Sequence, residues 1–120
     1  GKPLAEDPLI RRKLAEVEMK FAVTGVISRR LSWMQENKLF ALNETAMAKL
    51  LSTELVYDLA NVGIQVMGPY GELVPDSKYA ELQGWFAHMY QEAPHYKIAG
   101  GTSEIQKQII STRGLGLPGG

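Results

Sequence analysis

The sequence predicts an all-α fold, an antiparallel four-helix bundle. Apolar residues recur in steps of three and four along four segments, which is the period of an amphipathic helix. Residues that cap helices or form turns separate these segments. No segment sustains the apolar–polar alternation of a half-buried β-strand. Four helices joined by short connections are typical of an antiparallel bundle.

Length and composition indicate a single helical domain over residues 1–120. A chain of 120 residues is long enough for one hydrophobic core but not for two. Apolar residues make up 45% and charged residues 22%, which is ordinary for a globular domain and unlike a disordered chain. The 13 Lys and Arg residues balance 13 Asp and Glu residues, so no net field favours nucleic acid or an anionic membrane.

Several kinds of site are excluded. The chain has no cysteine, which excludes disulfides, thiolate metal sites and cysteine nucleophiles. His88 and His95 have no further ligands at metal spacing, so no metal site is expected. No apolar run reaches the ~20 residues of a membrane span, and no signal-peptide pattern is visible. We therefore expect a cytoplasmic protein, or one in another intracellular soluble compartment.

The first predicted helix begins at Asp7 and Pro8, because Asp is a good N-cap and Pro is favoured at the first helical position. It continues to about Gln35. Gly25 within this helix weakens it against Ala, which predicts a close contact with another helix there. One face carries the residues Ile10, Leu14, Val17, Phe21, Thr24, Ser28 and Leu31.

The second predicted helix is capped by Asn43 and ends near Gly68 and Pro69. Its apolar stripe consists of Leu51, Leu55, Leu59, Val62 and Val66. The segment from Gly68 to Asp76 contains two Pro and two Gly, which predicts a connection without helix.

The third helix is predicted to start at Asp76 and to end at Pro94. Its apolar residues are Tyr79, Leu82, Phe86 and Met89. The fourth is predicted from about Thr102 to Arg113, with Ile105, Ile109 and Ile110 on its inner side.

A glycine pair, Gly100 and Gly101, precedes the fourth helix. Thr102 or Ser103 can cap this helix, and Ser103 with Gln106 has the spacing of a capping box. A flexible turn before a helix N-terminus offers free N–H groups to a polar ligand or an anion. The same residues also suit a well-capped helix start without any ligand.

The exact residues of two segments are more specific than the turn and cap that they predict. Residues 100–106 read Gly-Gly-Thr-Ser-Glu-Ile-Gln, and residues 114–118 read Gly-Leu-Gly-Leu-Pro. These segments closely resemble the C-terminal end of acyl-CoA dehydrogenases, and residues 65–71 resemble a second signature of that family, Gln-x-x-Gly-Gly-x-Gly. The resemblance spans nearly the whole chain but only about the last third of a family member. We therefore expect a fragment-like chain without the family's N-terminal helical domain, its β-domain and the first helix of this domain.

The resemblance implies oxidation of an acyl-CoA thioester to the α,β-unsaturated acyl-CoA by a protein that uses FAD. The family's usual catalytic base is a Glu at the position of Gly100, so this chain has no carboxylate there. The backbone N–H of Gly100 remains available to polarise the thioester carbonyl. By the same resemblance, the base would come from the helix that precedes this chain or from a partner subunit.

The resemblance also implies contacts with FAD. The segment Gln65, Val66, Met67, Gly68 and Pro69 would meet the flavin diphosphate of a neighbouring subunit through backbone N–H groups and the Gln amide. Pro69 stands where the family has a second Gly, and it removes one N–H donor. Thr102 and Glu104 would contact FAD from the other motif. A helix C-cap followed by a turn is the alternative interpretation of residues 65–71.

Expected partners are an acyl-CoA substrate and either further copies of this chain, as a dimer or tetramer, or a related dehydrogenase subunit. The isolated chain is expected to self-associate, to hold FAD only weakly and to be inactive. Two alternatives stay open: a free-standing helical interaction module, and a subunit of a heteromeric dehydrogenase that lacks the base.

Overall fold

The computed structural model describes residues 3–119, and these residues form helices and loops without any strand. The main helices are α1 (Pro8–Glu36), α2 (Leu42–Met67), α3 (Trp85–Ile98) and α4 (Ser103–Ile109). The predicted all-α fold class with four helices is confirmed. Shorter turns are η1 (Leu4–Glu6), η2 (Gly68–Glu72), η3 (Glu81–Gly84) and a π-helical turn, η4 (Ile110–Gly114). Over residues 3–119, each helix is too short or too polar to cross a membrane.

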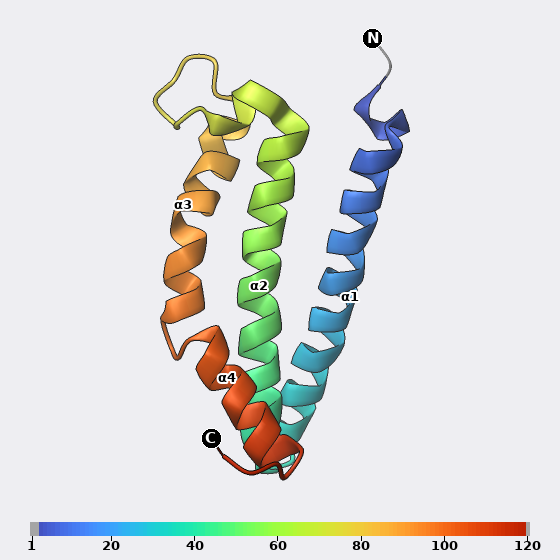
Figure 1. The fold of residues 1–120 in the computed structure, drawn as a ribbon, viewed down its shortest axis with the longest axis vertical. Coiled ribbons are helices and arrows are strands. Elements are labelled where there is room, and N and C mark those ends of the chain that lie inside the picture. Colours follow the sequence, from blue (N-terminus) through green and yellow to red (C-terminus); the bar gives the residue numbers. More distant parts are fainter. Residues whose placement is uncertain (1–2, 120) are drawn as a thin grey trace.

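Helix α2 is the centre of the molecule, and it packs against α1, α3 and α4. Figure 1 shows α1 on one side of α2 and the α3–α4 arm on the other. Helices α1 and α3 run opposite to α2, and α4 continues in the direction of α3 after a turn. The three long elements therefore form a layer in which α2 alone has neighbours on both sides.

Helix α1 begins as predicted. The Asp7 carboxylate accepts hydrogen bonds from the N–H groups of Leu9, at 2.8 Å, and Ile10, at 3.3 Å. The predicted apolar stripe faces α2 only in part, because the Phe21 side chain remains 64% exposed. Polar contacts complete the packing of α1 on α2: Lys13 donates to Gln65, and Lys20 pairs with Asp58.

The close helix contact predicted at Gly25 is wrong. A Cβ atom added at Gly25 would meet only the side chain of Arg29, on the same helix, at 3.5 Å. The close contact occurs instead at Gly63 in α2. A Cβ added at Gly63 would lie 2.1 Å from the ring of Phe86 in α3, so the glycine is what allows this aromatic ring to pack against α2.

Asn43 does not cap α2, which corrects the second prediction of a cap. Helix α2 starts one residue earlier, and the residue before it, Ala41, provides no side-chain cap. Asn43 instead packs against the end of η4, since a Cβ added at Gly114 would lie 2.3 Å from its Oδ1 atom. The predicted end of α2 is confirmed: the helix stops at Met67, and Gly68 has a φ of +58°.

The predicted start and end of the third helix are both wrong. Asp76 lies in a loop, and α3 begins only at Trp85, after Gly84 with a φ of +67°. Gly84 is buried so tightly that an added Cβ would lie 2.7 Å from the Leu73 carbonyl oxygen, and this packing fixes where the chain turns into α3. Pro94 lies inside α3 and removes one hydrogen bond, but the adjoining Ala93 is fully buried, and tertiary packing outweighs that loss.

The core is thin and consists largely of small residues. Its buried apolar side chains are Met34, Ala46, Leu55, Ala60, Ala87 and Ala93. The molecule measures 52 × 31 × 29 Å with a radius of gyration of 17.5 Å. A compact domain of this length has a radius of gyration of about 14 Å. The elongated shape leaves many large apolar side chains on the surface.

Candidate functional site

The glycine pair forms the turn between α3 and α4, as predicted. Gly100 has a φ of +72° and Gly101 a φ of +99°. Both values lie in the left-handed region, where glycine is favoured because it has no Cβ. No atom lies within 4 Å of a Cβ position built at Gly100, so this side of the turn is open.

The carbonyl groups of this turn are held from two helices. From α4, Gln106 Nε2 donates to the Gly100 oxygen at 3.0 Å and approaches the Gly101 oxygen at 3.4 Å. From α2, Lys49 Nζ donates to the Gly101 oxygen at 2.6 Å and to the Lys97 oxygen at 3.0 Å. The backbone oxygens on both sides of the turn therefore point toward the protein.

The predicted capping box of Ser103 and Gln106 is wrong, whereas the predicted cap by Thr102 is confirmed. Thr102 is the N-cap of α4, and its hydroxyl accepts from the N–H of Ile105 at 3.3 Å. Gln106 is buried and reaches back to the glycine carbonyls, as described above. Ser103 is also buried, and its hydroxyl donates to Glu54 Oε1 on α2 at 2.8 Å.

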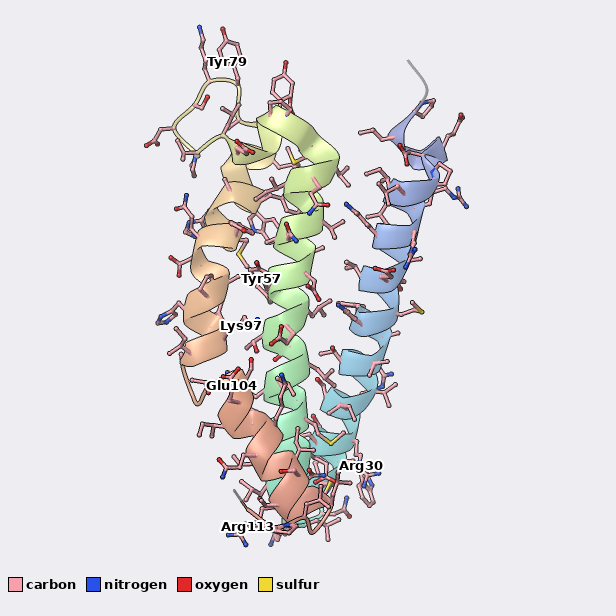
Figure 2. All side chains as sticks on the ribbon, viewed as in Figure 1. Arg30, Tyr57, Tyr79, Lys97, Glu104 and Arg113 are labelled. Carbon is pink, nitrogen blue, oxygen red and sulfur yellow. The ribbon has the colours of Figure 1, made fainter. Side chains whose placement is uncertain are left out.

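Glu54 connects α3 with α4, because its Oε2 atom also accepts from Lys97 Nζ of α3 at 2.9 Å. Burial raises the pKa of Glu54, but the hydrogen bonds from Lys97 and Ser103 outweigh it and lower the pKa below its ordinary value. The hydrogen bond to Glu54 raises the pKa of Lys97. The Lys97 ammonium also lies over the Tyr57 ring, 5.0 Å from its centroid (Figure 2).

The N–H groups of the turn are free to bind a ligand. Within residues 3–119, no acceptor is found for the N–H of Gly100 or of Gly101. Gly100 is exposed and Gly101 is half-buried. Backbone donors without an acceptor, in a turn whose carbonyl groups at Gly100 and Gly101 are hydrogen-bonded, suit an oxygen acceptor that carries negative charge.

A groove of about 610 Å³ lies beside the turn, and its lining includes Lys97, Thr102, Glu104 and Lys107. Figure 2 shows Glu104 at the start of α4, close to the turn. Hydrogen bonds from its own backbone N–H and from the Thr102 hydroxyl lower the pKa of Glu104. The groove therefore presents charges of both signs together with hydroxyl groups.

The second predicted set of site residues lies at the end of α2. Gln65 is exposed, and its amide accepts from Lys13 Nζ and donates to Asn61 at 3.0 Å. Val66 and Met67 are half-buried in the last turn of the helix, and Pro69 is exposed. Gly68 has open space around its Cβ position.

Packing explains why the last residue of this segment, Gly71, is a glycine. A Cβ added at Gly71 would lie 2.8 Å from the Ile64 Cα atom, so the chain can fold back onto α2 only with glycine there. A helix C-cap followed by a tight turn thus describes residues 65–71 well. The FAD contact of this segment stays a prediction.

The structure does not bring the two predicted sets together. Lys49, which contacts the glycine turn, precedes Gln65 by sixteen residues on the same helix. At 1.5 Å per residue, about 24 Å of α2 separate them. A ligand that contacts both sets must be long, or it must be bound by two chains.

Sequence reasoning missed Lys49, Glu54 and Lys97 as residues of the site. Lys49 and Gly101 are 52 positions apart, and no local motif connects them. Their contact depends on how α2 pairs with the α3–α4 arm. Only a prediction of helix register could have indicated it.

Comparison with known proteins assigns the family. The sequence profile of the acyl-CoA dehydrogenase C-terminal domain matches residues 1–115. The human mitochondrial short-chain specific acyl-CoA dehydrogenase is 28% identical over 113 residues, which cover 92% of this chain and 25% of that protein. The acyl-CoA dehydrogenase IpdE1 of Mycobacterium tuberculosis is 32% identical over 117 residues, which cover 95% of this chain and 28% of that protein. The chain thus spans only about a quarter of the length of these relatives.

Solved structures agree with this assignment. The ChsE4-ChsE5 complex from Mycobacterium tuberculosis contains a chain that superposes with a TM-score of 0.90 at 28% identity, covering 100% of this chain and 31% of that one. The Tcur3481-Tcur3483 steroid ACAD superposes with a TM-score of 0.91 over 98% of this chain and 30% of that one, and at 24% identity it supports the fold alone. The family is FAD-dependent in general. Because its profile covers nearly the whole sequence and the fold agrees, the chain belongs to the acyl-CoA dehydrogenase family, as its C-terminal helical domain.

Proposed function

We propose that the protein containing this chain oxidises an acyl-CoA thioester to the α,β-unsaturated acyl-CoA, and that this domain polarises the thioester carbonyl. The observation that carries the proposal is the turn at Gly100 and Gly101. Its carbonyls are held by Lys49 and Gln106, while its two N–H groups have no acceptor within residues 3–119. By the resemblance of residues 100–106 to the family motif, Gly100 also corresponds to the carbonyl-polarising residue of that motif.

The chemistry makes use of such donors. Removing a proton from the α carbon of a thioester places negative charge on the carbonyl oxygen, and a preorganised N–H stabilises that charge. When bound, FAD would supply the acceptor for the hydride that leaves the β carbon. Gly100 would donate its N–H to the thioester oxygen, and the open space at its Cβ position leaves room for the acyl group.

The base that takes the α proton must come from another residue. Gly100 has no side chain, and its φ of +72° is strained for any residue with a Cβ. Glu54 is already bound by Lys97 and Ser103. We propose that the base is supplied by a preceding part of the protein or by a partner subunit.

The residues predicted to hold FAD fit a polar cofactor in part. Val66 and Met67 lie inside α2, so their N–H groups are used by the helix. We therefore propose that the Gln65 amide and the exposed turn after Gly68 make the contact at this end. At the other motif, the Thr102 hydroxyl and the Glu104 carboxylate would approach the cofactor.

We propose an oligomer as the active form. The 24 Å between the two sets of site residues suits a cofactor shared by two chains. The partner is another copy of the same protein or a related dehydrogenase subunit. The ChsE4-ChsE5 structure is a complex of two differently named chains, which makes the second arrangement worth testing.

The test uses the full-length protein that contains this chain. Purified with FAD, it is mixed with acyl-CoA thioesters of increasing chain length and with ring-bearing acyl groups, alone and with candidate partner subunits. Bleaching of the flavin absorbance by at least one thioester in one of these combinations is expected. A protein that binds no flavin and shows no bleaching in any combination would contradict the proposal.

Two substitutions test whether Gly100 occupies the position of the base. Gly100→Glu adds a carboxylate and Gly100→Ala does not, but both carry the strain of the left-handed backbone, about 1–2 kcal/mol. Faster flavin reduction by Gly100→Glu than by Gly100→Ala in the protein alone is expected. Equal rates would contradict the assignment of Gly100.

A further inference from the structure

We infer that Lys49 is a positioning residue that holds the turn at Gly100 and Gly101 in the conformation that presents its N–H groups. Lys49 is not part of the sequence motifs. It lies on α2 and contacts the turn through its carbonyl oxygens. The effect on the turn follows from geometry alone. The effect on catalysis rests on the function proposed above.

The position of Lys49 is unusual for a lysine. Its side chain is half-buried on α2, and it forms no ion pair with any carboxylate in the part of the chain described. The ammonium group instead donates to two backbone oxygens, that of Lys97 at 3.0 Å and that of Gly101 at 2.6 Å. Lys97 belongs to the last turn of α3, so the charge also lies at the negative end of that helix.

One ammonium group therefore connects the two ends of the turn. The Lys97 oxygen precedes the glycine pair and the Gly101 oxygen closes it. Between them, Gln106 fixes the peptide that joins Gly100 to Gly101 through the Gly100 oxygen. The Ala99 N–H donates to the His95 oxygen at 2.9 Å, so the peptides on both sides of the Ala99–Gly100 peptide are hydrogen-bonded and the N–H of Gly100 has little freedom to turn inward.

Two consecutive glycines make this restraint necessary. Glycine has more backbone freedom than any other residue, and ordering it costs correspondingly more conformational entropy. The open side of Gly100 has no neighbouring atoms within 4 Å of its Cβ position that could restrain it. The restraint on the N–H donors therefore comes from the carbonyl side of the turn, where Lys49 and Gln106 donate hydrogen bonds.

The test compares Lys49→Met, which keeps the length of the side chain but removes the ammonium, with Lys49→Arg, which keeps a charged donor. Both are made in the full-length protein with its FAD. Hydrogen–deuterium exchange is measured for peptides that cover residues 95–110, where the N–H groups of Ala99 and Gln106 are hydrogen-bonded at the two ends of the turn. Flavin reduction is measured in the combination of subunits that is active.

Lys49→Met removes both hydrogen bonds of the ammonium and is expected to speed exchange in this segment at least about tenfold, which corresponds to ~1.4 kcal/mol. Its kcat for flavin reduction is expected to fall about 10- to 100-fold with a small change in KM, because donors to a developing negative charge act on the transition state. Lys49→Arg is expected to restore most of both. The control Lys78→Met, in the loop before α3, is expected to change neither.

Unchanged exchange in residues 95–110 of Lys49→Met would overturn the inference, and so would an equal increase across the whole chain, which indicates general destabilisation. Faster local exchange with an unchanged kcat would support the positioning by Lys49 and would contradict the donor role of Gly100. If Lys49→Met is insoluble, Lys49→Gln carries the same measurements and the same expected directions. These outcomes separate failure of the inference from failure of the proposed function.

Discussion

A single carboxylate on the central helix α2 connects α3 with α4 at the site. Glu54 accepts hydrogen bonds from Lys97 in α3 and from Ser103 in α4. The side chains of Glu54 and Lys97 remain 35% and 30% exposed, so solvent screens part of their attraction. At this scale the site is a set of contacts between helices, and the sequence motif supplies only some of its members.

Replacing Glu54 with Gln is expected to lower the free energy of unfolding by about 1 kcal/mol at pH 7, after allowance for the exposed fraction. The folded state lowers the pKa of Glu54 below its ordinary value of 4.5, so this contribution is present above pH 4.5 and is lost as the pH falls through the folded pKa. The pKa of Lys97 is raised above 10.5, so its contribution is present below pH 10.5 and is lost at higher pH.

Urea unfolding of residues 1–120 and of the Glu54→Gln variant, at pH 7 and at pH 3.5, tests this expectation. The difference between the two proteins is expected to shrink at the lower pH. Glu18→Gln is the control, because Glu18 is exposed on α1 and has no ion pair among residues 3–119. A difference for Glu54→Gln that stays constant with pH would contradict the ionic contribution.

Two glycines in helices are expected to respond oppositely to Ala. Gly63→Ala places a Cβ 2.1 Å from the Phe86 ring and is expected to destabilise the chain by about 1–3 kcal/mol. Gly25→Ala meets only the Arg29 side chain at 3.5 Å and is expected to stabilise it by up to about 1 kcal/mol. Thermal unfolding monitored by far-UV circular dichroism compares them, and equal effects of the same sign would contradict this account of α2–α3 packing.

At the scale of elements, the sequence predicts the helices better than their ends. The sequence predicts the helix ends at Asp7 and Gly68 correctly, because their cap conformations arise from neighbouring residues. The predictions for Asn43, Asp76 and Pro94 are wrong, because packing determines the roles of these residues. The start of α3 depends on Gly84 contacting Leu73, which no periodicity reveals.

The candidate site also combines features set by neighbouring residues with features set by helix packing. The turn at Gly100 and Gly101 and the cap at Thr102 follow from local sequence. Lys49 and Glu54 are separated from the motif by about fifty residues, and their contacts arise from the pairing of α2 with α3 and α4. Their roles could be inferred only after the fold placed them beside the turn.

The two aspartates predicted as caps provide a matched test. Asp7→Ala removes the acceptor for the N–H groups of Leu9 and Ile10 and is expected to cost about 1 kcal/mol and to fray the start of α1. Asp76→Ala, in the loop before α3, is expected to change stability by less than about 0.5 kcal/mol. Urea unfolding and exchange of the amides of residues 9–12 measure both effects. A larger loss for Asp76→Ala would contradict the observed start of α3.

The whole molecule exposes more surface to solvent than a compact monomer of the same mass. The accessible surface is 8457 Å². A compact monomer of 13.3 kDa exposes about 6,500 Å², so about 2,000 Å² is in excess. Stable protein interfaces bury about 1,200–2,000 Å² in total, or about half of that on each partner. The excess is therefore large enough for at least one stable interface.

Exposed apolar side chains occur on two flanks of α1. One flank contains Met19, Val23, Val26 and Trp33, each more than half exposed. The other borders a groove of about 380 Å³ between α1, α2 and the start of α3, which is lined almost entirely by apolar side chains that include Leu14, Val62 and Phe86. Apolar patches that are contiguous and hollowed favour association.

We therefore predict that residues 1–120 self-associate at micromolar concentration, with the groove beside Leu14 inside the interface. Leu14→Glu places a charge in this groove, and burying an unpaired charge is costly, so the dissociation constant is expected to rise at least about tenfold. Leu115→Glu, in the exposed C-terminal segment, is the matched control and is expected to change little. Sedimentation velocity over a range of concentrations measures both variants. A strictly monomeric parent chain would contradict the prediction as a whole, whereas equal dissociation constants for Leu14→Glu and the parent would place the interface on the other flank of α1.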